Sequence, residues 1–297
     1  MYHKPVLLQQ SVEGLNIQPG GTYVDVTYGG GGHSKEILSN LAQGKLIGFD
    51  QDQDAINNKI NDERLVLVNH NFRFLKNFLK YNNALPVDGI LADLGVSSHQ
   101  FDVAERGFSL RFPGKLDLRM NQNQAITAAL VLNDYDQDKL AVIFKNYGEL
   151  PNARAITSAI VKFRSGKRLV NFEDLRQALA HFPTPGRENK FFARVLQALR
   201  IEINQELEVL KEFLLQTTEV LKTGGRLVVI SYHSLEDRLV KNFMRSGNLE
   251  GKLDKDFYGN VNTPFNIINK KPIIPDEEEI RENNRSRSAK LRIAEKR

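Results

Sequence analysis

Short apolar runs alternate with amphipathic segments along the first hundred residues. Four of these runs, at 23–26, 46–49, 65–68 and 87–91, have the length and the β-branched content of buried strands. The segments between them carry helical patterns, and the first of these helices opens at His33 and Ser34. Strands that alternate with helices in this way form parallel sheets. The pattern therefore predicts an α/β, Rossmann-like fold, with a mostly parallel sheet and helices on both faces.

The strand–helix alternation stops near residue 104 and resumes near residue 205. Helical periods are found between these points, at 134–146, 153–164, 172–180 and 190–203, after a loop that we expect beside the site at 105–120. The later part predicts a helix at 206–222, a strand at 226–231, a helix opened by a capping box at 234–237, and a last strand at 288–293. We therefore expect a discontinuous domain of residues 1–104 and 205–297, with an all-helical insertion at 105–204.

A run of four glycines, Gly29 to Gly32, separates the first predicted strand from its helix. Glycine lets the backbone approach a ligand at a distance that any Cβ would prevent. The N–H groups at the start of the helix point into the same space. Asp50 follows about 20 residues later, where an acidic side chain typically accepts hydrogen bonds from ribose hydroxyls. The pattern favours a nucleoside-cofactor site over a glycine-rich surface turn that binds nothing.

The acidic residues around this turn distinguish between cofactors. The dinucleotide pattern G-x-G-x-x-G is not met, which disfavours an NAD-linked oxidoreductase. Asp25 ends the first strand and Asp93 the fourth, so that three carboxylates with Asp50 meet at one edge of the sheet. They would repel a pyrophosphate but suit the cationic ammonium and sulfonium of S-adenosylmethionine. The residues therefore predict S-adenosylmethionine as the cofactor.

Composition excludes several kinds of chemistry. The chain has no cysteine, which removes disulfides, thiolate metal sites and the cysteine attack used in methylation at pyrimidine C5. We expect no metal site. No apolar run is long enough to span a bilayer and the N-terminus has no signal-peptide pattern, so the expected location is the cytoplasm.

The net charge of +5 is concentrated in two regions. Residues 105–200 carry 16 basic and 9 acidic side chains, and residues 281–297 carry 7 and 2. Basic regions on an otherwise slightly acidic chain are typical of proteins that dock on a phosphate backbone, although a solvated charged surface has the same composition. Phe108, Phe112, Phe191 and Phe192 are candidates for stacking on a base, with core packing as the alternative.

Eight segments match a known family in its order along the chain. They are HKPVLL (3–8), GGGGHS (29–34), DLGVSS (93–98), ERGFS (105–109), LDLRM (116–120), QALRIEINQEL (197–207), SYHSLEDRLVK (231–241) and NNRSRSAKLRIAEK (283–296). On these segments the chain resembles the bacterial 16S ribosomal RNA cytidine N4-methyltransferases. The resemblance implies a class I methyltransferase fold and N4-methylation of a cytidine in the P-site region of 16S rRNA, with the helical insertion recognising the RNA.

The resemblance also implies which residues act. The implied cofactor contacts are Gly31, Gly32, His33, Asp50, Phe72, Asp93 and Gln100. We expect Asp93 to accept the proton of the amine, with His233 as the alternative base or as a structural cap of the next helix. The partner implied is 16S rRNA of the small ribosomal subunit. The sequence leaves open a homodimer, the choice between free rRNA and assembled subunit, and a non-catalytic RNA-binding protein with a vestigial pocket.

Overall fold

The computed structural model describes residues 5–111, 114–255, 257–259 and 261–297. Its chain forms two compact units. The sheet unit comprises residues 1–95 and 207–297, and the helical unit comprises residues 96–206. The sequence predicted these divisions at 104/105 and 204/205. The assignment of the two parts as methyltransferase and RNA-recognition domains stays a prediction.

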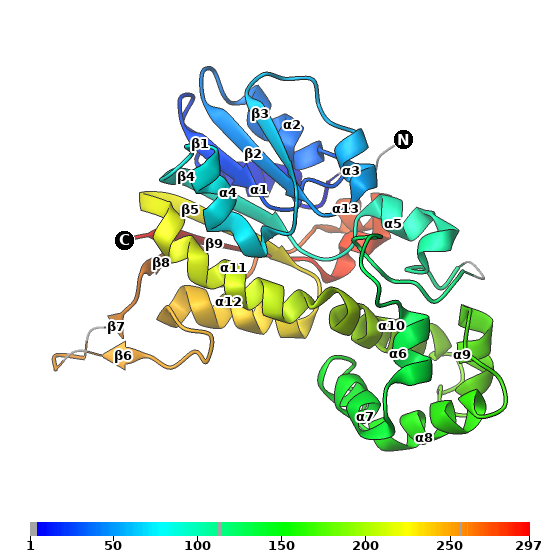
Figure 1. Cartoon of the computed structure of the whole chain (residues 1–297). Coiled ribbons are helices and arrows are strands. Elements are labelled where there is room, and N and C mark those ends of the chain that lie inside the picture. Colours follow the sequence, from blue (N-terminus) through cyan, green and yellow to red (C-terminus); the bar gives the residue numbers. More distant parts are fainter. Residues whose placement is uncertain (1–4, 112–113, 256, 260) are drawn as a thin grey trace. The chain divides into compact units, whose positions relative to one another are not determined.

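The sheet unit is built on seven strands in the order β3-β2-β1-β4-β5-β9-β8 (Figure 1). The strands are β1 (Thr22–Asp25), β2 (Lys45–Asp50), β3 (Leu65–Asn69), β4 (Val87–Asp93), β5 (Leu221–Ser231), β8 (Phe265–Ile267) and β9 (Lys290–Lys296). The first five strands are parallel to one another, and β9 is antiparallel to both β5 and β8. A mostly parallel sheet confirms the predicted Rossmann-like class.

Alternate residues of each strand enter two different cores, because successive side chains point to opposite faces of a sheet. Val24 and Ile90 belong to one core, which also contains side chains of α4 (Leu75–Tyr81), α11 (Glu206–Val220) and α12 (Ser234–Ser246). Tyr23 and Leu91 belong to the other, with side chains of α1 (Leu8–Leu15) and α2 (Gly32–Ser39). Both faces are therefore covered by helices, as the apolar strand runs predicted.

The remaining elements of this unit are short. They are α3 (Gln53–Asn57), the 3₁₀ helix η1 (Phe72–Phe74), α13 (Glu277–Glu282), the 3₁₀ helix η3 (Asn284–Ser288) and a two-stranded sheet of β6 (Asp254–Lys255) and β7 (Val261–Asn262). The acidic run Asp276–Glu279 caps and begins α13. The Asp276 carboxylate accepts the hydrogen bond of the Glu279 N–H.

Several predicted boundaries were wrong by a few residues, and two of them have a clear physical reason. Strand β5 begins at Leu221 rather than at Arg226, because Leu221 pairs with Val87 and the ladder resumes at Gly89 and Arg226 after an irregularity. The capping box lies one residue earlier than predicted. His233 is the N-cap of α12, and its Nδ1 accepts the hydrogen bond of the Glu236 N–H.

The helical unit has its own core. Its helices are α5 (Ser98–Asp102), η2 (Ala104–Arg106), α6 (Ala128–Asp134), α7 (Gln137–Asn146), α8 (Ala153–Arg164), α9 (Phe172–Ala178) and α10 (Glu188–Asn204). The predicted helix at 153–164 is confirmed to the residue, and its spacing places Ile156 and Ile160 in this core. Helix α6 was not predicted. It begins where the Thr127 hydroxyl accepts the hydrogen bond of the Leu130 N–H.

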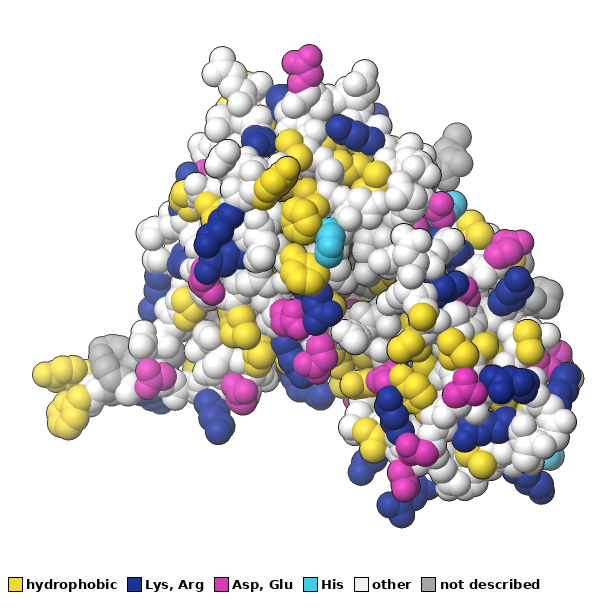
Figure 2. Space-filling model, viewed as in Figure 1, with side chains coloured by type: hydrophobic (Ala, Val, Ile, Leu, Met, Phe, Trp, Pro, Cys, Tyr) yellow, Lys and Arg dark blue, Asp and Glu magenta, His cyan; other side chains and the backbone are white. Residues whose placement is uncertain are grey.

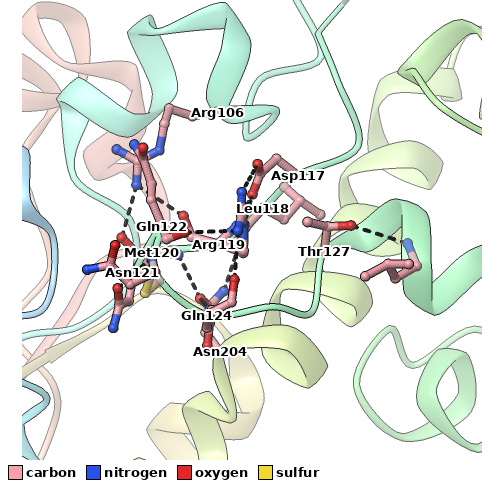
Figure 3. Close-up of polar contacts among 12 residues, drawn as sticks. Arg106, Asp117, Leu118, Arg119, Met120, Asn121, Gln122, Gln124, Thr127 and Asn204 are labelled. Carbon is pink, nitrogen blue, oxygen red and sulfur yellow. Dashed lines mark hydrogen bonds and ion pairs between the residues drawn. The ribbon is translucent and has the colours of Figure 1, made fainter.

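The segment between η2 and α6 has little regular structure in its described part, and side chains hold it in place (Figure 3). Arg106 is 5% exposed, and its Nη2 donates to the carbonyls of Arg119 and Met120 at 3.0 Å each. Arg119 makes a two-pronged ion pair with Asp117. A buried guanidinium with carbonyl partners satisfies the carbonyls of a segment that has no ladder of its own.

Asn204, at the end of α10, completes this arrangement (Figure 3). Its Nδ2 donates to the Leu118 carbonyl at 2.8 Å, and its Oδ1 accepts from the Met120 N–H at 2.8 Å. Leu118 between these contacts has a φ of +63°, which a non-glycine residue seldom adopts. One buried amide therefore fixes a strained turn more than eighty positions away in the sequence.

Across the part of the chain that the structure describes, no helix combines the length and apolarity needed to cross a membrane.

Candidate cofactor and active site

Three carboxylates lie at the carboxyl ends of adjacent parallel strands. Asp25 ends β1, Asp50 ends β2 and Asp93 ends β4, and β1 pairs with both of the other strands. Parallel strands bring their carboxyl ends to one edge, where open α/β sheets bind ligands. The structure therefore brings together the three acidic residues that the sequence placed there.

The glycine turn passes over the end of β2. The Tyr28 N–H donates to the Phe49 carbonyl, and the Gly29 N–H donates to Asp50 Oδ2 at 2.8 Å. Gly31 has a φ of +75°, and a Cβ at this position would lie 2.9 Å from the Tyr28 hydroxyl. A Cβ on Gly32 would overlap the Pro5 ring. Both glycines are therefore required by backbone conformation and close packing.

Asp50 is held by backbone on both oxygens. Oδ2 accepts from the Gly29 N–H, and Oδ1 accepts from the Asp52 N–H at 2.8 Å. Burial raises the pKa of Asp50 to about 6, and these two hydrogen bonds oppose that rise. The carboxylate thus couples the glycine turn to the end of β2.

Asp25 is almost completely buried, at 1% exposed. Its Oδ2 accepts from the Ser34 hydroxyl at 2.7 Å, and its Oδ1 accepts from the Thr27 N–H at 3.1 Å. Burial raises the pKa of Asp25, and nearby His33 and these hydrogen bonds counteract the rise. Asp25 therefore joins the end of β1 to the first turn of α2.

Asp93 is surrounded by three segments that are distant in sequence. Its backbone N–H donates to the Thr27 hydroxyl at 2.7 Å, and its Oδ1 accepts from the Tyr232 hydroxyl at 2.8 Å. Its Oδ2 lies 3.8 Å from Nδ1 of His33. Burial raises the pKa of Asp93 to about 6, while His33 and the Tyr232 hydrogen bond lower it. Asp93 therefore changes its charge close to neutral pH.

The orientation of His33 follows from its other nitrogen. Nε2 lies 3.1 Å from the carbonyl oxygen of Val6. A carbonyl only accepts hydrogen bonds, so Nε2 carries a proton and Nδ1 is directed at Asp93. The Leu7 N–H donates to Glu279 Oε1 at 2.7 Å, which holds the same N-terminal segment against α13.

The electrostatics of this edge suit a cation. Three carboxylates with raised pKa values compete for positive charge, and a sulfonium or ammonium group would stabilise their ionised forms. Helix α2 begins at Gly32 without a side-chain cap at Gly31, so its first N–H groups suit a carboxylate. Both features fit S-adenosylmethionine, whose amino-acid part carries both charges.

Phe72 and Gln100 take different positions. Phe72 opens η1 just beyond β3, is partly buried, and packs edge-on against Phe213 with ring centroids 5.3 Å apart. Gln100 belongs to the helical unit, where it is 4% exposed and its Oε1 accepts from the Ser97 N–H at 3.2 Å. Phe72 is thus on the predicted edge of the sheet, and Gln100 forms the capping box of α5. Their contacts with the cofactor stay predictions.

His233 has a structural role at the start of α12. Its Nδ1 accepts from the Glu236 N–H at 3.3 Å, and its Nε2 lies 3.1 Å from Glu236 Oε1. The capping role that the sequence allowed for His233 is therefore present. Its role as a base stays a prediction.

Sequence reasoning missed several side chains of the site. Tyr232 binds Asp93, Thr27 binds the backbone of Asp93, and Ser34 binds Asp25. Tyr232 lies inside the segment SYHSLEDRLVK, and Ser34 closes the glycine segment, so the motifs contained a signal for both. Thr27 lies two residues after Asp25. Its partner, the Asp93 N–H, lies 66 residues further along the chain, so no local pattern indicated this contact.

The candidate stacking faces lie in the helical unit. Phe108 and Phe192 are each 5% exposed and belong to its core, and Phe191 is partly buried against it. Phe112 lies outside the described residues. Core packing, the alternative named for these side chains, is therefore the observed role of Phe108 and Phe192.

Curated proteins from several bacteria are similar to the chain over nearly its whole length. "Ribosomal RNA small subunit methyltransferase H" of Bacteroides fragilis strain YCH46 is 59% identical over 296 residues, which cover 99% of this chain and 97% of that protein. The proteins of the same name from Phocaeicola vulgatus and Flavobacterium psychrophilum are 59% and 58% identical, covering 100% and 98% of this chain and 98% and 100% of those proteins.

A family model gives the same result. The model of the MraW methylase family matches residues 1–297. This match confirms the predicted enzyme class, a methyltransferase with a class I fold, and with it S-adenosylmethionine as the methyl donor. The fold, the acidic edge of the sheet and the match over the whole chain lead to one assignment: the chain belongs to the MraW methylase family.

Proposed function

We propose that the chain transfers a methyl group from S-adenosylmethionine to N4 of a cytidine in the P-site region of 16S ribosomal RNA. The observation that carries this proposal is the edge formed by Asp25, Asp50 and Asp93 over the glycine turn. It is supported by the 59% identity to a protein named for methylation of small-subunit ribosomal RNA. We propose the cytoplasm, where ribosomal RNA is found, as its location.

The residues that we propose to hold the methyl donor are those that the resemblance to the family implies. Gly31, Gly32 and His33 would face its amino-acid part, and Asp50 its ribose hydroxyls. Phe72 would lie beside the adenine, with Asp93 and Gln100 completing the set. When bound, S-adenosylmethionine supplies an electrophilic methyl group on a sulfonium.

The chain must do two things for the acceptor. The lone pair of the cytosine amine is delocalised into the ring, so the amine needs a hydrogen-bond acceptor that restores its nucleophilic character and takes its proton as the new N–C bond forms. Alignment of the two reactants contributes much of the remaining acceleration. A carboxylate is suited to this task at a pH above its pKa.

We assign the proton acceptor to Asp93 rather than to His233. The pKa of Asp93 is about 6, so it is mostly ionised at neutral pH yet more basic than an ordinary aspartate. His233 has both ring nitrogens directed at Glu236 at the start of α12. Using His233 as a base would disrupt the cap of that helix.

We propose that the helical unit contacts the RNA. The face of this unit drawn in Figure 2 carries Lys and Arg side chains between hydrophobic ones. Exposed basic residues of its helices and loops include Arg154, Lys162, Arg176, Arg187 and Lys190. The base must leave its stack to be methylated, and phosphate contacts would hold the flanking strand.

Fewer basic residues of the C-terminal segment are available to bind RNA than its composition implied. Arg292 and Lys290 both pair with Asp237 of α12, at 2.7 and 3.4 Å. Arg297 donates to the Asn266 side chain at 2.6 Å. These side chains have partners within the sheet unit, so part of the excess charge serves the fold.

The deciding experiment is mass spectrometry of 16S rRNA nucleosides from cells with and without the gene. We expect N4-methylated cytidine at one P-site position only when the gene is present, and restored by the wild-type gene. A gene carrying Asp93→Ala should not restore it. An unchanged nucleoside profile would refute the assigned substrate.

Three further measurements test the alternatives and the binding of RNA. Equilibrium binding should detect S-adenosylmethionine and not NAD, which would exclude the oxidoreductase. Transfer of tritiated methyl from the donor to purified 30S subunits and to free 16S rRNA should be measured side by side. Binding without transfer to either would favour the non-catalytic RNA-binding protein. Affinity for RNA should fall steeply between 50 and 200 mM salt, as expected for several phosphate contacts.

A further inference from the structure

Tyr232 follows the last residue of β5 and lies next to the end of β4. The two strands pair through Asp93 and Ile230, which places the Tyr232 hydroxyl 2.8 Å from Asp93 Oδ1. A tyrosine hydroxyl beside a carboxylate oxygen donates a hydrogen bond to that oxygen. One oxygen of the carboxylate therefore has a fixed donor.

Tyr232 makes three contacts, one through its backbone, one through its hydroxyl and one through its ring. Its backbone N–H donates to Glu236 Oε2 at 3.0 Å, and its hydroxyl donates to Asp93. Its ring lies beside Gly95, where an added Cβ would come within 3.4 Å of the ring carbon Cδ2. Gly95 also has a φ of +102°, which strongly favours glycine. The backbone contact with Glu236 and the neighbouring Gly95 backbone thus limit the positions that the Tyr232 hydroxyl can take.

The second oxygen of Asp93 is left facing His33. Oδ2 lies 3.8 Å from His33 Nδ1, beyond hydrogen-bond length, while Oδ1 is engaged by Tyr232. The Asp93 backbone is anchored independently by the Thr27 hydroxyl. These contacts therefore restrict rotation of the carboxylate. Oδ2 is the oxygen with fewer hydrogen-bond partners.

We propose that Tyr232 is a positioning residue, whose hydroxyl donates to Oδ1 of Asp93, favours the ionised carboxylate and leaves Oδ2 for the ligand that Asp93 binds. The inference rests on the proposed function, in which Asp93 takes part in methyl transfer. Asp93 alone touches the reacting groups, and Tyr232 acts through Asp93.

A donor to a carboxylate stabilises its ionised form, so the loss of the hydroxyl makes Asp93 more basic. The charged and titratable groups that face Asp93 come from several elements. They are His33 of α2, Asp25 of β1, Glu236 of α12 and Tyr232 itself. His33 and Tyr232 favour the ionised form, whereas Asp25 and Glu236 oppose it. Without Tyr232, only His33 remains to favour ionisation.

The test is the titration of Asp93 in Tyr232→Phe. The ¹³C shift of the Asp93 side-chain carboxyl, assigned by its loss in Asp93→Asn, is followed against pH in the unliganded full chain. We expect the midpoint to rise by about one pH unit or more, the size expected for a hydrogen bond to an ionised group. The pH at which affinity for S-adenosylmethionine falls by half should rise by the same amount.

Tyr23→Phe is the matched control. Tyr23 is also a buried tyrosine of the sheet unit, and its hydroxyl accepts from the Gln18 N–H at 2.7 Å near the opposite end of β1. Its removal loses a hydrogen bond of the fold without touching Asp93. The midpoint should stay within about 0.2 pH unit of wild type, because distant sites behave independently.

Gly95→Ala gives a second perturbation that keeps the hydroxyl. The φ of +102° strains an alanine at this position, and its methyl group would lie in van der Waals contact with the Tyr232 ring, so a backbone shift that moves the ring should raise the midpoint in the same direction. A midpoint unchanged in Tyr232→Phe, or raised equally in Tyr23→Phe, overturns the proposal. The titration needs no RNA, so this failure is distinct from the absence of methylated cytidine in cells.

Discussion

Replacing Asp93 by asparagine should stabilise the protein at alkaline pH while it abolishes function. The side chain of Asp93 is 22% exposed and its pKa rises from 3.8 to about 6 on folding, mainly through burial. A carboxyl group with a raised pKa favours the folded state fully at a pH below 3.8. That contribution is lost as the pH rises through 6.

The structure sets the magnitude of this effect. A difference of two pKa units between folded and unfolded chain corresponds to about 3 kcal/mol at pH 8 and roughly 1.5 kcal/mol at pH 5. Asparagine keeps the main contact, because its Oδ1 still accepts the hydrogen bond of the Tyr232 hydroxyl. This buried donor therefore keeps its partner, and the lost charge dominates.

Urea unfolding at pH 5 and at pH 8 measures the difference. We expect Asp93→Asn to be more stable than wild type at both values, by a margin that about doubles at pH 8. Methyl transfer should be lost, as is usual where an active site is held at a cost in stability. A variant less stable than wild type at pH 8, or a margin independent of pH, would refute the reasoning.

Three other substitutions test the site and the helical unit. Ser34→Ala removes the 2.7 Å hydrogen bond to buried Asp25 and should lower the free energy of unfolding by about 1.5–3 kcal/mol, measured by urea unfolding. Gly31→Ala places a Cβ 2.9 Å from the Tyr28 hydroxyl at a φ of +75° and should weaken binding of S-adenosylmethionine by roughly tenfold or more, measured by calorimetry. Asn204→Ala leaves buried backbone groups without partners and should lower the unfolding free energy by about 2–3 kcal/mol, seen as reduced hydrogen-exchange protection of the helical unit.

Each substitution has a control in the same chain. Ser39→Ala removes an exposed hydroxyl at the other end of α2, Gly20→Ala adds a Cβ with nothing within 4 Å, and Asn123→Ala truncates an exposed amide near the Asn204 cluster. All three should stay within about 0.5 kcal/mol of wild type. Controls as damaging as their partners would contradict the roles assigned to Ser34, Gly31 and Asn204.

The fold was largely predictable because its signals are local. Strand runs, the glycine turn and the helix at 153–164 were found from period and length alone, and each agrees with the structure within a few residues. The errors occurred where tertiary pairing overrides local pattern. The local pattern places Leu221 at the end of a helix, yet Leu221 pairs with Val87 and belongs to the sheet. The cap of α12 is His233, whereas local preference favours Ser234.

The site was predictable only in part. Acidic residues at strand ends can be placed together once the sheet is known to be parallel, so Asp25, Asp50 and Asp93 were found. Their partners could not be placed in the same way. The hydroxyl that binds Asp93 comes from 139 residues away, and the carbonyl that orients His33 comes from 27 residues away on the other side.

The sequence by itself determined the alternation of strands and helices, the acidic edge over a glycine turn and the family to which the chain belongs. These features depend on side-chain period and on residue types at fixed short spacings, which a linear chain records directly. Only the tertiary structure decided which oxygen of Asp93 is occupied, why His33 faces it and why its pKa lies near 6. Those properties arise from burial and from contacts between remote segments, and they exist only once the chain has folded.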